Sequence, residues 1–133
     1  MRILVHAILG AALLMPVTLS AQSLQDDPEV RQGFYAIGLA DEIRKNCPSI
    51  SPRLVRAYTF LKALEDYALQ AGYSREDIDA LRDNDAARDA LEAEIAADLA
   101  ARGATPGNTS GYCNVGREEI ARGTNAGKLL KGE

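Results

Sequence analysis

The chain has 133 residues and a mass of 14.3 kDa, and an expected leader of 21 residues would leave 112 for one folded domain. Its only histidine, His6, falls within that leader, and tryptophan is absent. Without histidine, the mature chain is excluded from Ser-His-Asp and Cys-His catalysis and from histidine-ligated metals or haem. It retains 14 basic and 19 acidic residues, a net charge of −5, which argues against nucleic acid as a partner.

The first 21 residues have the pattern of a secretory signal peptide. Arg2 provides a positive charge, residues 3–15 are largely apolar, and small residues follow Pro16. Cleavage is expected after Ala21, although a cut after Ser23 fits the pattern as well. The apolar run is too short to cross a bilayer, which needs about 20 residues. We therefore expect export through the inner membrane to the periplasm, with no transmembrane span after cleavage.

A first helix is predicted over residues 28–46. The Asp26-Asp27-Pro28 run supplies an aspartate N-cap and a proline whose missing N–H costs nothing in the first turn. Pro48 disfavours helical backbone at Cys47 and therefore ends the helix. Residues three or four apart mark its apolar stripe, namely Val30, Phe34, Ile37, Ala40, Ile43 and Cys47.

A second helix is predicted after the Ser51-Pro52 pair, which repeats the cap-then-proline pattern. It ends at Gly72, which suits the left-handed position after a helix. Its apolar stripe comprises Leu54, Tyr58, Leu61, Leu64 and Ala68.

A third, short helix is predicted to end near Arg82. Ser74 and Asp77 have the spacing of a capping box, with aspartate in place of the usual glutamate or glutamine. Tyr73, just before the cap, would pack on Ile78 as a hydrophobic staple.

A fourth helix is predicted over residues 86–102, with Asp85 as its N-cap and Gly103 after its last turn. Its apolar stripe is formed by residues four apart, Leu91, Ile95 and Leu99.

A fifth helix follows the loop at residues 104–111 and ends before Gly123. The tail at residues 124–133 would dock as one turn or fray. No strand is predicted. The mature chain, residues 22–133, is thus expected to be a single all-α domain, a small bundle of four to five short helices ordered over about residues 27–123.

Cys47 and Cys113 are the two cysteines of the chain. In an oxidising compartment the simplest arrangement is a disulfide between them, which would tie the end of the first helix to the start of the last. Closing a loop of this length stabilises a fold by roughly 4 kcal/mol on the chain-entropy model. The bond is interpreted as structural, because neither a Cys-x-x-Cys motif nor a nearby histidine would lower a thiol pKa.

Other patterns are poor matches to known sites. Asp83, Asp85 and Glu94 occupy positions 1, 3 and 12 of an EF-hand-like loop, but position 6 is Arg88, where the turn needs glycine. The glycine-lysine run at residues 123–128 lacks the spacing of a P-loop. We therefore expect no catalytic residue, no cofactor and no metal ligand.

Tyr35 and Tyr67 are the candidate residues for a partner surface. Both lie at the edges of the apolar stripes of the first two helices, where an aromatic side chain can serve an interface. The other aromatic residues of these helices are expected to pack in the core.

Several stretches of the sequence carry a family resemblance, namely residues 41–51, Ala57, Phe60-Leu61, Gly72-Tyr73, 113–117 and 119–123. They resemble an uncharacterised family of small exported alphaproteobacterial proteins, a domain of unknown function, over essentially the whole mature chain. Both cysteines match in that family, so the resemblance also favours a bond between Cys47 and Cys113, and it implies no catalytic residue. It further implies an accessory role on the periplasmic side of a respiratory complex, because such genes lie among those for the proton-pumping NADH-quinone oxidoreductase.

These observations favour a non-enzymatic binding or accessory protein with a protein partner, peripherally associated with an inner-membrane respiratory complex. The alternative is an acid- or stress-responsive periplasmic chaperone, because protonation of its many carboxylates would loosen the helices. A hydrolase with paired carboxylates is a third hypothesis, since 19 acidic residues allow many such pairs.

Overall fold

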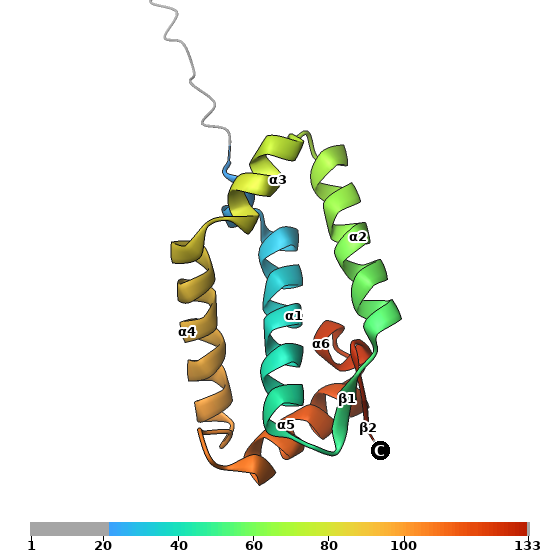
Figure 1. Ribbon diagram of the computed structural model, residues 1–133, viewed down its shortest axis with the longest axis vertical. Helices are drawn as coiled ribbons and strands as arrows, with labels where there is room; N and C mark the ends of the chain where they lie inside the picture. Colours follow the sequence, from blue (N-terminus) through green and yellow to red (C-terminus); the bar gives the residue numbers. More distant parts are fainter. Residues whose placement is uncertain (1–21, 133) are drawn as a thin grey trace, which may run out of the picture.

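The computed structural model describes residues 22–132, so the predicted leader lies outside the described residues (Figure 1). The prediction of a small all-α bundle closed by a disulfide is confirmed, with a sixth helix and a small sheet in addition. In chain order the elements are the 3-10 turn η1 (Leu24–Asp26), α1 (Pro28–Asn46), β1 (Ile50–Pro52), α2 (Leu54–Gln70), α3 (Arg75–Arg82), α4 (Asp85–Ala101), α5 (Thr109–Arg122), α6 (Asn125–Lys128) and β2 (Leu130–Gly132).

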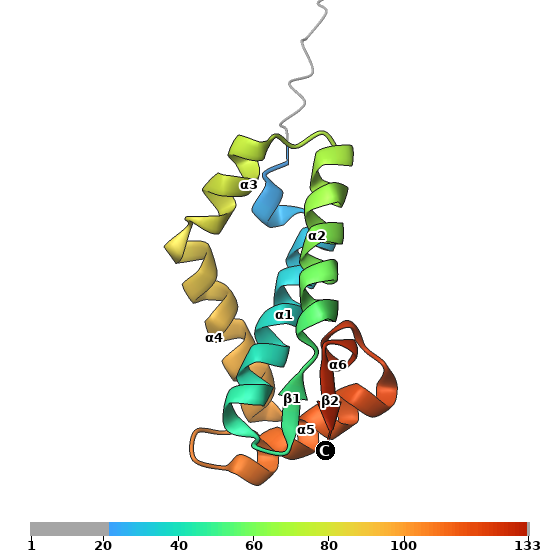
Figure 2. The ribbon, with the colours of Figure 1, turned by 45° about the vertical axis from the view of Figure 1, so that its right-hand side comes forward.

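Helix α1 is the centre of the bundle, with α4 on one side, α2 on the other and α5 crossing its C-terminal end (Figures 1 and 2). Its N-cap is confirmed, because the Asp27 carboxylate accepts hydrogen bonds from the N–H groups of Glu29 and Val30. Neighbours on several sides bury a wider face than the predicted stripe. Its buried residues are Val30, Gly33, Ala36, Leu39, Ala40 and Ile43.

The capping box of α3 is confirmed. The Ser74 hydroxyl accepts a hydrogen bond from the Asp77 N–H at 3.1 Å, and the Asp77 carboxylate accepts one from the Ser74 N–H at 2.7 Å. The predicted N-cap of α4 is wrong by one residue. Asn84 caps this helix by accepting from the Ala87 N–H at 3.0 Å, while Asp85 is its first helical residue.

The Ser51-Pro52 pair does not start a helix, contrary to prediction. It belongs to β1, which pairs antiparallel with β2, so that Ser51 lies opposite Lys131. The C-terminal tail therefore docks, and regular structure continues to Gly132. The reason is hydrophobic, because Leu129 and Leu130 are both buried in the core.

The disulfide between Cys47 and Cys113 is present and joins the end of α1 to the first turns of α5. Helix α5 approaches α1 and β1 closely at Gly116, where a Cβ atom would collide with Ile43 and Ile50. The glycine is thus required for packing at this point in the helix interior. Gly123 ends α5 in the left-handed region, with φ at +63°.

Two hydrophobic clusters hold the bundle together. We call the larger one, which surrounds the disulfide, the disulfide core; its buried residues come from α1, β1, α4, α5, α6 and β2 and from the Ala104 loop. We call the other the small core; it consists of Leu24, Val30, Leu64 and Ala68, with Phe34, Tyr73, Ile78 and Leu81 packed against it. Helix α3 contributes no fully buried residue to either cluster.

Candidate binding surfaces

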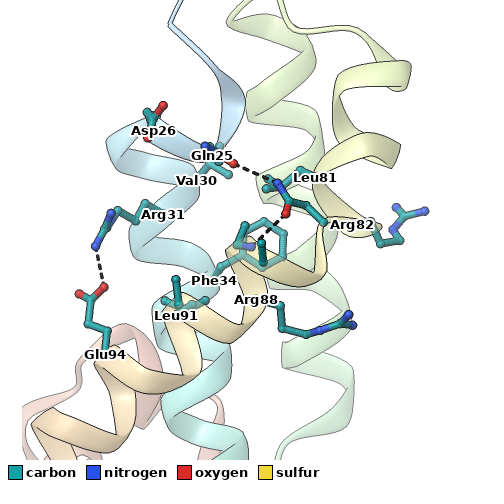
Figure 3. Close-up of a pocket in the computed structure, with 14 residues that line it drawn as sticks. Gln25, Asp26, Val30, Arg31, Phe34, Leu81, Arg82, Arg88, Leu91 and Glu94 are labelled. Carbon is teal, nitrogen blue, oxygen red and sulfur yellow. Dashed lines mark hydrogen bonds and ion pairs between the residues drawn. The ribbon is translucent and has the colours of Figure 1, made fainter.

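An apolar cleft lies where α1, α3 and α4 meet, and Figure 3 shows the side chains that line it. Its volume is about 530 Å³. Phe34 and Val30 of α1, Leu81 of α3 and Leu91 of α4 supply its large apolar side chains. The alanines of α4 leave room between these side chains, so the cleft has the size and chemistry to accept apolar side chains of a partner.

Polar contacts frame the cleft. Arg31 of α1 pairs with Glu94 of α4 at 2.6 Å on one side, and the Asn84 amide donates to the Gln25 side chain at 3.2 Å near the start of α4 (Figure 3). The Arg31–Glu94 pair is about half exposed, so water screens it and it contributes little to stability. A partner could therefore displace this pair at small cost.

The carboxylates considered for calcium are held by arginines. Glu94 pairs with Arg31, and Asp85 pairs with Arg88 one turn further along α4. Residues 22–132 contain no group of three or more His, Cys, Asp or Glu side chains arranged to hold a metal ion.

Tyr35 lies between α1 and α4 and not on an open surface. Its hydroxyl donates to the Asp98 carboxylate at 2.8 Å. Burial, the hydrogen bond to Asp98 and the charge of Asp98 together raise the pKa of this hydroxyl.

The Tyr35–Asp98 contact continues into a chain of polar groups that sequence reasoning missed. Arg102, at the C-cap of α4, reaches Asp98 at 3.4 Å and the buried Glu119 of α5 at 2.7 Å. Glu119 also accepts a hydrogen bond from the Thr124 hydroxyl. These contacts join α1, α4, α5 and the N-cap of α6, and nothing in the local sequence spacing relates them.

Tyr67 lies elsewhere, near the start of α1. Its hydroxyl and that of Tyr73 each approach the Asp27 carboxylate at 3.4 Å. Partial burial, followed by the charge of Asp27, raises the pKa of both tyrosines. Tyr35 and Tyr67 thus have separate internal partners, and a partner surface at these two residues stays a prediction.

The predicted core stripe of α2 is wrong over the first half of the helix. Leu54, Tyr58 and Leu61 are 72%, 72% and 43% exposed, and Val55 beside them is 81% exposed. We call these four residues the α2 face. The reason is that α2 has a second apolar stripe, which is the one that packs on the bundle; it consists of Ala57, Phe60, Leu64 and Ala68.

The comparisons with known proteins identify a family. Residues 22–131 match a model described as a family of unknown function, DUF5333. The chain belongs to this family. Neither the curated proteins nor the solved structures contain a match to this DUF5333 chain. Within the described part of the DUF5333 domain, no helix is both long and apolar enough to cross a membrane.

Proposed function

We propose that this DUF5333 chain is an exported, non-enzymatic binding protein that acts as an accessory on the periplasmic side of an inner-membrane respiratory complex. The observation that carries the proposal is the cleft between α1, α3 and α4, with its apolar interior and its exposed ion pair at the rim. Such a site recognises an apolar segment by burial and a flanking charge by exchange with Arg31 or Glu94.

The covalent and charge properties of the chain support this placement. A disulfide buried at Cys47 and Cys113 suits an oxidising compartment, and the signal-peptide pattern of the first 21 residues suits export to it. The resemblance of residues 41–51 and 113–123 to small exported proteins supports the respiratory complex as the assembly to test first.

Site-specific photo-crosslinking in living cells tests the proposal. A photoreactive amino acid at Ala90, which lines the cleft, is expected to form an adduct with a subunit of the NADH-quinone oxidoreductase. The same probe at Ala97, exposed on α4 outside the cleft, is the matched control and is expected to form none. Adducts of equal yield at the two positions, or none with a subunit of that complex, would contradict the proposal.

A second candidate function is an acid-responsive chaperone, and the ion pairs between helices favour it. Arg31–Glu94 joins α1 to α4, and Arg75–Glu65 joins α3 to α2, both beside the small core. The hydrogen bond from Arg75 lowers the pKa of Glu65, so its contribution to folding is lost as the pH falls through that lowered value. A near-UV circular dichroism spectrum that is the same at neutral pH and at about pH 3 would remove this candidate.

A further inference from the structure

The α2 face lies at the positive pole of an acidic protein. Residues 43–64 and 123–132 together contain seven Lys or Arg and no Asp or Glu. Residues 65–98, which include α3 and most of α4, contain eleven Asp or Glu and only three Lys or Arg. The net charge of the chain therefore hides a strong separation between two regions of opposite sign.

The unpaired cations gather at the same pole. Of the fourteen Lys and Arg side chains within residues 22–132, nine form ion pairs with carboxylates of that part of the chain. The five that form none there are Arg53, Arg56, Arg117, Lys128 and Lys131.

These five cations belong to elements that are neighbours in space. The Arg53 side chain donates to the Leu130 carbonyl at 3.0 Å, and β2 with Lys131 pairs with β1, just before α2. Helices α5 and α6, which carry Arg117 and Lys128, lie beside this sheet, next to the start of α2 (Figure 2). The exposed apolar side chains of the α2 face thus project from the region where cations lack partners.

We propose that the α2 face docks on an anionic phospholipid bilayer. Leu54, Val55 and Leu61 would enter the boundary between headgroups and acyl chains, and the amphipathic ring of Tyr58 suits the headgroup level. Arg56, Lys128 and Lys131, all exposed, would meet lipid phosphates. Apolar side chains flanked by cations and free of nearby acids are the pattern of an interfacial anchor.

Two other occupants fit these observations less well. A second copy of the chain, docked face to face, would bring the same unpaired cations together, and like charges oppose such contact. A folded protein partner would bury lysines such as Lys128 and Lys131, and protein interfaces are depleted in lysine. A lipid surface uses both the exposed apolar area and the unpaired positive charge.

The inference goes beyond the proposed function, does not require that the cleft be occupied, and rests only on the proposed location beside the inner membrane. Docking through the α2 face would also orient the protein, because an anionic surface repels the acidic α3 and α4. Helices α2 and α4 flank α1 on opposite sides, so the cleft beside α4 would stay open to a partner (Figure 1).

Vesicle flotation with the oxidised protein as it is recovered from the cell tests the inference. The protein is expected to float with vesicles that contain phosphatidylglycerol in phosphatidylcholine and to stay behind with phosphatidylcholine alone. Added salt should release it, because screening weakens the attraction to the headgroups.

Variants with matched controls separate this face from general charge effects. Val55→Asp and Arg56→Glu are expected to weaken the partition onto anionic vesicles roughly tenfold or more. Val55 and Ala86 are both the second residue of a helix, and aspartate is favourable there, so Ala86→Asp is the matched control for the first variant. Arg82→Glu on α3 makes the same change of charge as Arg56→Glu. Both controls are expected to bind within about twofold of the unmodified protein.

Several outcomes would overturn the inference. One is no flotation with anionic vesicles. Another is equal binding to both vesicle types, and a third is equal loss of binding in the variants and their controls. A dimer in sedimentation that Val55→Asp dissociates, without vesicle binding, would instead assign the face to a second copy. Because the Ala90 crosslink reports on the cleft, its persistence when flotation fails would overturn this inference alone.

Discussion

The disulfide core and the small core are stabilised in different ways. The first collects buried side chains from six elements and encloses the bond between Cys47 and Cys113. The second has four buried residues, and the helix beside it, α3, buries none. Near the small core, the fold depends on caps and on exposed ion pairs such as Arg75–Glu65. The comparison teaches that this small domain concentrates its stability at one end and leaves the other end, with the cleft, easier to open.

The largest expected effect comes from removing the disulfide. Replacing Cys47 and Cys113 by alanine frees a loop that spans a sequence separation of 66 residues, which should lower the free energy of unfolding by about 4 kcal/mol. Urea unfolding measures this loss, and amide exchange should show it in α1 and α5 while the local opening of α3 changes little. An equal loss of protection in α3 would show that the two cores open as one unit.

The next effect concerns the buried carboxylate of the disulfide core. Glu119→Gln would leave Arg102 without its closest partner, at 2.7 Å, and should cost about 2 kcal/mol of unfolding free energy. Glu118→Gln is the matched control, because Glu118 is its neighbour in sequence but half exposed, and it should cost less than about 0.5 kcal/mol. Similar costs for the two variants would mean that the polar chain from Tyr35 to Thr124 does not hold these helices together.

A smaller effect is expected at the cap of α3. Ser74→Ala removes the acceptor for the Asp77 N–H and should cost about 1 kcal/mol, chiefly in the local opening of α3. Ser110→Ala changes an exposed serine whose hydroxyl bonds the Asn108 side chain without capping a helix itself. Amide exchange of α3 should respond to the first variant and not to the second. If the loss were instead global, the small core would not be an independent unit.

The smallest effect is a pH dependence confined to the same end. Hydrogen bonds from the Ser74 backbone and hydroxyl lower the pKa of Asp77, and the hydrogen bond from Arg75 lowers that of Glu65. A carboxylate with a lowered pKa stabilises the fold above its ordinary value and loses that contribution as the pH falls through the lowered one. Between about pH 5 and pH 3, protection of α3 amides should therefore fall more than that of α5 amides, after correction for intrinsic exchange. Equal decreases would contradict the comparison.

Local sequence patterns predicted much of the fold because caps and breakers act within a few residues. The bounds of α1, the capping box of α3 and the end of α5 at Gly123 all follow from neighbours in the chain. The wrong cap of α4 shows the limit of this reasoning. Asn84 and Asp85 are both good caps, and only the geometry of the preceding turn selects Asn84.

The candidate surfaces were harder to predict than the helices. The stripe of Leu54, Tyr58 and Leu61 has helical spacing, so the pattern identifies a helix correctly but does not say which of its two apolar stripes is covered. The cleft brings residues of α1, α3 and α4 together across more than fifty positions of sequence, a juxtaposition that no local pattern encodes.

The amino-acid sequence by itself determined that this chain is helical, where its principal helices lie and which two cysteines could join, because capping, periodicity and composition act locally. The tertiary structure alone decided that Ser51 and Pro52 form a strand with the C-terminal tail, and that Glu119 is buried against Arg102. It also decided that the α2 face is open to solvent. These features depend on which surfaces meet across long stretches of chain, and burial of apolar area at those contacts selects among the patterns that the local sequence allows.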